Sequence, residues 1–382
     1  MMNPYITIEH EKIREKVREF AQKEVKPLAF ELDEEEKFSS HLTNRMGELG
    51  LFGIYLPKEY GGQAKDYLSL LIAVEEIAKV DASQASTLAA HNSLGIGPIY
   101  YFGSEEQKQK YLPKLTSGEN IWAFGLTEDN AGSDSRGTES SGILEGEDWW
   151  INGRKKFISN ASSDLSLGVT LQVVTANDNG KKELSAILVE RSTDGFKAKP
   201  LKGKMMWRAS DTAELTFENC KVPKENLLGN LGEGAKIMLQ TLDSGRLTIA
   251  AMGLGLAQGA YEMALSYSKK REQFGKPISK FQAIGFKLAD MATKIEAARH
   301  LLYHACWLKD NGYSFGKEAA MAKLFCSEVA QEVANEAVQI HGAHGLIKES
   351  EVERFYRDQR ILQIGEGTSE ILRLVISRHI GC

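Results

Sequence analysis

The sequence predicts an α+β fold that is mostly α-helical, with a β domain between two helical regions. Apolar residues recur at helical spacing before residue 120 and after residue 230, whereas short strand-like runs occupy the segment between them. Strands and helices do not alternate along the chain, which excludes a doubly wound parallel sheet. We expect an N-terminal helical domain (1–120), a middle antiparallel, barrel-like β domain (121–230) and a C-terminal helical bundle (231–382).

The first 120 residues show the pattern of amphipathic helices. Ile13, Val17 and Phe20 recur at steps of three and four, with polar residues between them. A second helix is expected from Leu68 onward. A third is expected over 105–115, with Ser104 as its N-cap.

The pattern changes near residue 121. Asn152-Gly153 predicts a hairpin, because this dipeptide adopts the positive φ angles of a tight turn. Strands are expected over 167–175, 184–190 and 213–217. After residue 232, helical periodicity returns, and long helices are expected over 262–271, 281–308 and 318–340.

A carboxylate between two glycines is the most informative local feature. Glu366 is flanked by Gly365 and Gly367, and Thr368 or Ser369 can cap the apolar run that follows. A glutamate held in such a turn suits a general base that must reach a buried carbon acid. The alternative is a glycine-rich helix cap with a solvated glutamate.

Composition excludes several classes of function. The 382-residue chain has 47 Lys and Arg against 52 Asp and Glu, a net charge of −5, which argues against nucleic acid as the main partner. The four cysteines lack ligand-like spacing, so we expect reduced thiols in a cytoplasmic protein. No apolar run reaches about 18 residues, so no membrane span is expected. A metal site at His341 and His344 is not expected, because glycines intervene and no third ligand is near.

Three further segments each have two interpretations. The polar loop 127–134 can hold a pyrophosphate or a flavin edge, or it is an ordinary β-domain loop. Phe157 shares a strand face with Ser159, so its ring packs either on a planar cofactor or in the core. Arg271 at a helix end either clamps phosphate or is a solvated charge.

Together these segments resemble the acyl-CoA dehydrogenase family over essentially the whole chain, and most closely its short-chain (butyryl-CoA) type. The matching segments are 124–134, Lys156-Phe157-Ile158-Ser159-Asn160, 271–277 with Gln282, 339–345, Arg357-Asp358 and Gly365-Glu366-Gly367-Thr368-Ser369-Glu370. The segments 242–246 and 288–291 support the short-chain type.

The resemblance implies a C-terminal four-helix bundle, a homotetramer and bound FAD. The residues that would contact FAD in their own subunit are Phe124, Leu126, Thr127, Gly132, Ser133, Phe157, Ile158, Ser159, Thr368, Ser369 and Glu370. Those that would come from a neighbouring subunit are Arg271, Phe274, Gln282, Gln339, Ile340, Gly342 and Ala343. Those that match substrate contacts are Ser133, Asp243, Arg246, Gly365 and Gly367.

The resemblance also implies a reaction. Glu366 would remove the pro-R α-hydrogen of an acyl-CoA thioester while a hydride leaves Cβ for the flavin, and electrons would pass to an electron-transfer flavoprotein. Burial against apolar acyl carbons should raise the pKa of Glu366.

Four sites, five residues in all, depart from the family pattern. Asp129-Asn130 stands where Pro-Gly is common, and Asn tolerates a left-handed φ, so the loop should survive. Phe157 replaces a frequent Trp. Gly245 occupies the position of the base in isovaleryl-type members. Gly365 replaces a common Tyr, which suggests a short acyl group that is branched or cyclic.

Three alternative functions remain at this point. A relative could act on acyl or aminoacyl groups bound to a carrier protein, which sequence separates poorly from an acyl-CoA enzyme. An oxidase using O₂ would carry an extra C-terminal domain. A catalytically silent CoA-binding scaffold is the alternative from a different class, and the intact Glu366 argues against it.

Overall fold

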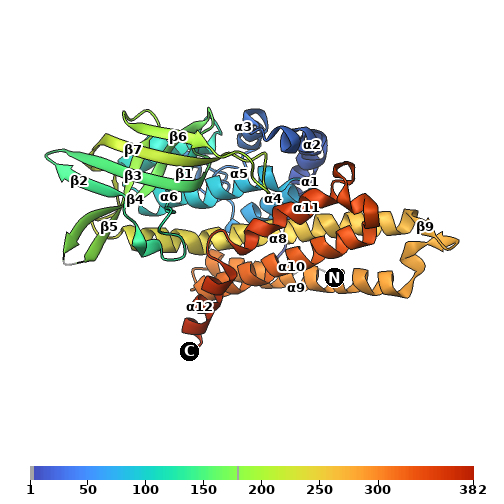
Figure 1. Cartoon of the computed structure of the whole chain (residues 1–382). Helices are drawn as coiled ribbons and strands as arrows, with labels where there is room; N and C mark the ends of the chain where they lie inside the picture. Colours follow the sequence, from blue (N-terminus) through green and yellow to red (C-terminus); the bar gives the residue numbers. More distant parts are fainter. Residues whose placement is uncertain (1–3, 179) are drawn as a thin grey trace.

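The computed structural model describes residues 4–178 and 180–382. Helices come first, a single large sheet follows, and helices return, so the predicted α+β, mostly α fold is confirmed (Figure 1). The sheet lies over one end of the long C-terminal helices, and the small hairpin of β9 (Glu272–Gln273) and β10 (Lys276–Pro277) lies at the other end (Figure 1).

Seven α-helices are described before the sheet. They are α1 (Ile8–Phe20), α2 (Lys26–Glu35), α3 (Ser40–Glu48), α4 (Tyr67–Ala78), α5 (Ala82–Ala90), α6 (Gly97–Phe102) and α7 (Glu105–Thr116). Ser104 caps α7 as predicted, and Gln107 completes a capping box with it. All residues of α4 are buried, which fits a helix that is apolar on most sides and lies at the centre of the molecule.

The sheet has the order β6-β7-β3-β2-β4-β5-β8, and β1 pairs with β4 off this path. The strands are β1 (Ile121–Gly125), β2 (Ser141–Glu145), β3 (Asp148–Ser159), β4 (Ser166–Asp178), β5 (Lys181–Glu190), β6 (Phe196–Pro200), β7 (Thr212–Pro223) and β8 (Leu227–Leu228). Its pairings are antiparallel except β1–β4 and β2–β4, which are parallel. The loop after β1 crosses over instead of forming a hairpin, so β1 and β2 run in the same direction.

The predicted hairpin at Asn152-Gly153 is wrong. Both residues lie inside β3, at a register shift opposite β7. Gly153 has φ 149°, and a Cβ there would come 2.3 Å from the hydroxyl of Ser140. The side-chain oxygen of Asn152 accepts a hydrogen bond from the main-chain N–H of Asn219 at 2.8 Å. The dipeptide therefore forms a β-bulge, which uses the same conformational freedom as a turn.

Three long helices form the C-terminal bundle: α8 (Gly234–Lys270), α9 (Gln282–Asp310) and α10 (Gly316–His341). The shorter α11 (Val352–Asp358) and α12 (Ser369–His379) pack on α10. The helix predicted over 262–271 is only the end of α8, which begins at Gly234. The earlier part of α8 was not predicted as part of this helix because it contains several glycines. These glycines permit close packing: a Cβ on Gly255 would come 2.4 Å from the carbonyl oxygen of Glu75 on α4.

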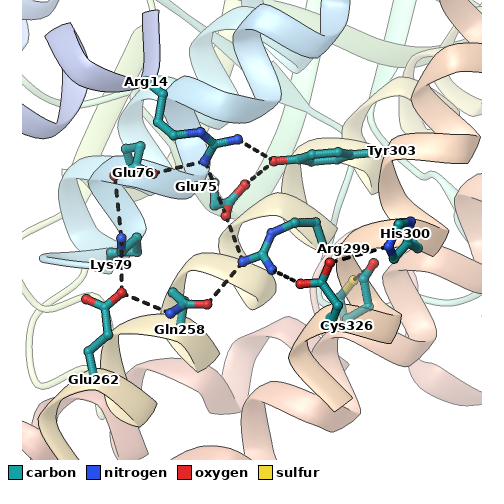
Figure 2. A network of polar contacts seen from close by, with 12 residues as sticks. Arg14, Glu75, Glu76, Lys79, Gln258, Glu262, Arg299, His300, Tyr303 and Cys326 are labelled. Carbon is teal, nitrogen blue, oxygen red and sulfur yellow. Dashed lines mark hydrogen bonds and ion pairs between the residues drawn. The ribbon is translucent and has the colours of Figure 1, made fainter. Parts of the chain in front are cut away.

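One hydrophobic core joins the two helical regions, and a buried polar network lies beside it (Figure 2). Arg14 of α1 bonds to Glu76 of α4 at 3.0 Å and to the hydroxyl of Tyr303 of α9 at 2.9 Å. Tyr303 in turn donates to Glu75 at 2.6 Å, and Arg299 contacts the same carboxylate at 3.3 Å. These contacts hold α1, α4 and α9 in a fixed arrangement.

Candidate active site

Glu366 lies in a turn between the 3₁₀ segment Gln359–Gln363 and α12. Its φ of 53° is uncommon for a residue with a side chain, and such conformations cluster at functional sites. Of the two predicted caps, Thr368 is the N-cap, and its hydroxyl accepts from the main-chain N–H of Ile371 at 3.2 Å. The turn and the helix start therefore fix the backbone of Glu366.

The carboxylate of Glu366 faces Gly245 in α8. A Cβ on residue 245 would come 2.0 Å from Oε2 and 2.9 Å from Cδ of Glu366, and 3.2 Å from Cδ2 of Leu94. Oε2 is buried and has no hydrogen-bond partner in the described residues. A buried polar atom without a partner is costly, so this oxygen is available for a ligand. Leu94, which sequence reasoning did not single out, lines the same space.

Burial raises the pKa of Glu366 to about 7, although Lys323 and Arg246 oppose the shift. A carboxyl group with a pKa near neutrality can both accept and release a proton at physiological pH. The predicted rise of the Glu366 pKa agrees with the geometry. Burial of the carboxyl group by the protein itself produces the rise, without the acyl carbons.

Of the expected substrate residues, Arg246 lies near the Glu366 carboxylate, and Asp243 is paired with Arg246. Asp243 and Arg246 form an ion pair within α8, with 2.6 Å between Oδ1 and Nη1. Arg246 is only 5% exposed, and its buried Nε has no hydrogen-bond partner in the part of the chain that the structure describes. The structure thus places the motif at 243–246 and the glycines around Glu366 in one site.

Lys323 also belongs to this site and was not predicted. It lies on the buried face of α10, and its Nζ donates to the carbonyl oxygen of Gly367 at 2.6 Å. The only sequence signal is a lysine on the helix face that carries Ala319, Ala320 and Cys326, where a charged side chain is unusual.

The segment before Glu366 is anchored to both other domains. Asp358 accepts from the main-chain N–H of Trp207, in the loop after β6, at 2.7 Å. Arg357 bonds to Asp33 of α2 at 2.7 Å, and Arg354 bonds to the carbonyl oxygen of Val80 at 3.0 Å. Glu366 therefore follows a segment that the rest of the chain holds firmly.

The loop after β1 is held by a buried ion pair that sequence reasoning also missed. Lys155, 1% exposed, contacts Glu128 at 2.6 Å, and Glu128 accepts from the main-chain N–H groups of Glu139 and Ser140. Phe124 is buried, and Gly132 is exposed with open space around it. The other expected cofactor residues of this loop are the partly buried Leu126 and Thr127 and the exposed Ser133.

The loop forms a tight turn with Asp129-Asn130 in place of Pro-Gly, but for a different reason from the one expected. In the described residues, neither of these two positions has a positive φ. Instead, Glu128 and Ala131 exchange main-chain hydrogen bonds of 3.1 and 3.2 Å across a tight turn. A turn that needs no left-handed residue accepts both side chains.

Phe157 presents its ring to the outside at the end of β3. It is 65% exposed and has φ 60°, at a register shift in the pairing with β7. Its neighbour Ile158 is only 3% exposed and packs in the sheet core, so its side chain cannot line a ligand site from the surface. Ser159 is partly buried.

The residues expected from a neighbouring subunit lie together at the far end of the bundle. Tyr267 of α8 stacks on His341 of α10, with ring centroids 4.4 Å apart, which brings the ends of the two helices together. The exposed members are Arg271, Phe274, Gln282, Gln339, Gly342 and Ala343, whereas Ile340 is buried. Lys270 is 25 residues beyond Gly245 in α8, about 38 Å along the axis. Within one chain, these residues and Glu366 cannot surround the same ring system.

The last three expected cofactor residues begin α12. Thr368 is partly buried, Ser369 is buried with its hydroxyl unpartnered, and Glu370 is exposed. They adjoin Glu366 directly in the chain.

A polar groove away from Glu366 is lined by charged groups that pair with one another. The groove, of about 540 Å³, lies among α1, α4, α8 and α9, along the network of Figure 2. Its cations and carboxylates are matched: Arg14 and Arg18 contact Glu76, and Lys79 contacts Glu262. Over residues 4–178 and 180–382, no cluster of three metal-ligating side chains is found, and no helix is long and apolar enough to cross a membrane.

Comparisons with known proteins agree with this geometry. Three family models match: acyl-CoA dehydrogenase N-terminal domain at 7–119, middle domain at 123–220 and C-terminal domain at 232–381. The chain belongs to the acyl-CoA dehydrogenase family. It is accordingly an oxidoreductase of the acyl-CoA dehydrogenase class, and it is close to the short-chain type.

The relatives span the whole chain. A probable acyl-CoA dehydrogenase of Bacillus subtilis (strain 168) is 49% identical, covering 99% of this chain and 100% of the relative. A short-chain specific acyl-CoA dehydrogenase of Clostridium acetobutylicum is 45% identical, with 98% of each covered.

Two solved structures share the fold. Butyryl-CoA dehydrogenase from Megasphaera elsdenii matches with a TM-score of 0.96 at 40% identity, covering 99% of this chain and 100% of that one. A chain in the structure described as the electron transferring flavoprotein of Acidaminococcus fermentans matches with a TM-score of 0.96 at 46% identity, covering all of both chains.

The family uses FAD, and the residues of this chain fit that cofactor. Phe157 offers an exposed ring to a planar ring system, and the open space at Gly132 admits a phosphate close to the backbone. Within the described residues, Oε2 of Glu366 has no hydrogen-bond partner, so it is a free acceptor for a substrate. When bound, FAD supplies an acceptor for a hydride.

Proposed function

We propose that this enzyme removes two hydrogens from Cα and Cβ of a short, branched or cyclic acyl-CoA, with Glu366 as the base. The observation that carries the proposal is the Glu366 carboxylate, whose Oε2 is buried, faces Gly245 and has no hydrogen-bond partner among the described residues. The α-proton of a thioester is weakly acidic, so its removal needs a positioned base with a pKa near the working pH. Glu366, with its pKa of about 7, meets that need.

Gly365 supports a branched or cyclic acyl group. The three atoms nearest to a Cβ at this position belong to Ile361, at 3.6 to 3.8 Å, which is ordinary van der Waals contact. A Cβ therefore fits at residue 365, and the glycine leaves the position next to Glu366 without a side chain. A small branch on the acyl chain fills such a space and gains from the contact. The butyryl-CoA relative supports a short chain.

The assembly we propose is a homotetramer in which the far end of one bundle completes the cofactor site of another subunit. Exposed apolar side chains at that end support it: Phe274 is 93%, Phe286 60% and Leu346 75% exposed. An electron-transfer flavoprotein is the proposed acceptor, on the strength of the Acidaminococcus fermentans comparison. We propose a cytoplasmic location because the described cysteines are all free thiols.

The test is an anaerobic titration of the purified, FAD-loaded enzyme with a panel of acyl-CoAs. We expect loss of the visible flavin band with isobutyryl-CoA and 2-methylbutyryl-CoA, less with butyryl-CoA and least with octanoyl-CoA. Glu366→Gln should lose this reaction by about 10²- to 10⁴-fold while keeping the oxidised FAD spectrum. Faster reduction by octanoyl-CoA would refute the branched-chain assignment. Full activity of Glu366→Gln would refute the base.

A further inference from the structure

Lys323 is a buried ammonium group with one strong acceptor. The residue is 0% exposed in the middle of α10. Its Nζ donates at 2.6 Å to the carbonyl oxygen of Gly367, the residue that follows Glu366. In the described part of the chain, no carboxylate lies within ion-pair distance of it. Burying an unpaired charge is costly, so such a lysine needs a compensating role.

The charges around Lys323 belong to the catalytic site. Burial lowers the pKa of Lys323 to about 8, and Arg246 on α8 acts in the same direction, whereas Glu366 in the turn and Glu370 on α12 favour its protonated form. Of the cations that act on the Glu366 carboxylate, Lys323 has the larger effect and Arg246 the smaller. Tyr67 on α4 also interacts electrostatically with the Glu366 carboxylate, and its hydroxyl donates to the carbonyl oxygen of Ser244.

The hydrogen bond to Gly367 has a second consequence. Glu366 and Gly367 both have positive φ, at 53° and 101°. Glycine adopts such angles readily, but the positive φ of Glu366 must be held by contacts around the turn. Thr368 fixes the turn on its C-terminal side by capping α12, and Lys323 fixes it through the carbonyl oxygen of Gly367. The same ammonium group thus holds the turn and places a positive charge near its carboxylate.

We propose that Lys323 is a positioning residue for the base: it fixes the Glu366–Gly367 turn through the Gly367 carbonyl and favours the ionised carboxylate by its charge. This inference rests on the proposed role of Glu366. The step it affects is proton transfer from Cα of the thioester to Oε2 of Glu366, which leaves the electron pair of the C–H bond on the substrate as an enolate.

The experiment isolates that proton transfer. In 3-thiabutyryl-CoA, sulfur replaces Cβ, so the α-protons can exchange with solvent but no hydride can leave. Exchange of these protons in D₂O is followed by NMR on the FAD-loaded enzyme from pH 5.5 to 9. Wild-type exchange should rise as Glu366 ionises.

Lys323→Met removes the charge and the donor. The pH of half-maximal exchange should move up by about one pH unit, with about a tenfold loss at low pH that is recovered at high pH. Lys323→Arg should keep the wild-type profile because it keeps the charge. Lys317→Met, at the partly exposed start of the same helix, is the matched control and should leave the profile unchanged.

The outcomes separate the two proposals. Exchange that persists in Glu366→Gln would refute the base itself. If exchange requires Glu366 but Lys323→Met keeps the wild-type pH profile, the role of Lys323 alone is refuted. The same holds if Lys323→Met lowers the exchange rate equally at every pH. FAD content and melting temperature are recorded for each variant. Should the methionine variant not fold, Lys323→Gln, which keeps a donor without charge, must show the same upward displacement for the proposal to stand.

Discussion

The carboxylate of Glu366 occupies the space that a side chain on Gly245 would need. A Cβ at 245 would come within 2.0 Å of Oε2, far inside van der Waals contact. By resemblance, isovaleryl-type members place their base at this position of α8. In the present geometry a side chain at 245 and the observed Glu366 exclude one another, so the glycine is part of the way in which this chain places its base.

Gly245→Ala should therefore impair catalysis without unfolding the protein. The added methyl group displaces the Glu366 carboxylate, and a displacement of about 1 Å can cost about 100-fold in kcat. Steady-state rates, FAD content and melting temperature would be measured together. Gly285→Ala on α9 is the control, because a Cβ there meets nothing within 4 Å. Unchanged kcat in Gly245→Ala would show that Glu366 functions from another position.

Gly365→Tyr should change the substrate preference toward linear chains. The position tolerates a Cβ, so the protein should fold, while the ring fills the space proposed for a branch. We expect the ratio of kcat/KM for isobutyryl-CoA to that for butyryl-CoA to fall by about tenfold or more. Gly365→Ala should lie between the two. An unchanged ratio in both variants would place the branch elsewhere.

The separation between Arg271 and Glu366 predicts complementation between subunits. Arg271→Glu and Glu366→Gln should each be nearly inactive alone, because one weakens cofactor binding and the other removes the base. Co-expressed with different tags and purified as a hybrid, they should recover activity, since some sites then combine Glu366 of one subunit with Arg271 of its neighbour. Lys269→Glu, two residues earlier on α8, is the control for the charge change. A hybrid without activity would mean that Arg271 serves its own chain.

Asp358 predicts a pH-dependent stability. Burial, with the nearby Asp81 and Asp33 adding to it, raises its pKa to about 7, above the usual 3.8. In the folded protein the carboxyl group keeps its proton up to about pH 7, whereas in the unfolded chain it ionises near pH 4. Its contribution to stability is therefore full below about pH 4 and is lost as pH rises to about 7.

Asp358→Asn removes this dependence, since the amide stays neutral and can still accept from Trp207. The melting temperature of this variant relative to the natural protein should be higher at pH 8 than at pH 5. Asp290→Asn, on the exposed face of α9, should show the same difference at both pH values. An equal difference for Asp358→Asn at both pH values would mean that the carboxyl group is ionised throughout.

The sequence alone predicted features that depend on neighbouring residues in the chain. Ser104 and its helix, three strands of the middle domain and the glycines around Glu366 are local signals, because caps and periodicity act over one or two turns. The failure at Asn152-Gly153 is instructive: a turn and a bulge need the same backbone freedom, and only pairing with β7 distinguishes them. The early part of α8 was missed because its glycines serve packing against α4 and α10.

The chemistry of the site required the tertiary structure. A glutamate between two glycines is visible in the sequence, but its pKa of about 7 depends on burial against α8, more than a hundred residues earlier in the chain. Lys323 shows the same limit. A lysine in an alanine-rich helix has no local signal of its role, and only the packing of α10 brings its ammonium group to the Gly367 carbonyl. Burial and electrostatic interactions depend on distance in space, which the sequence specifies only through the complete fold.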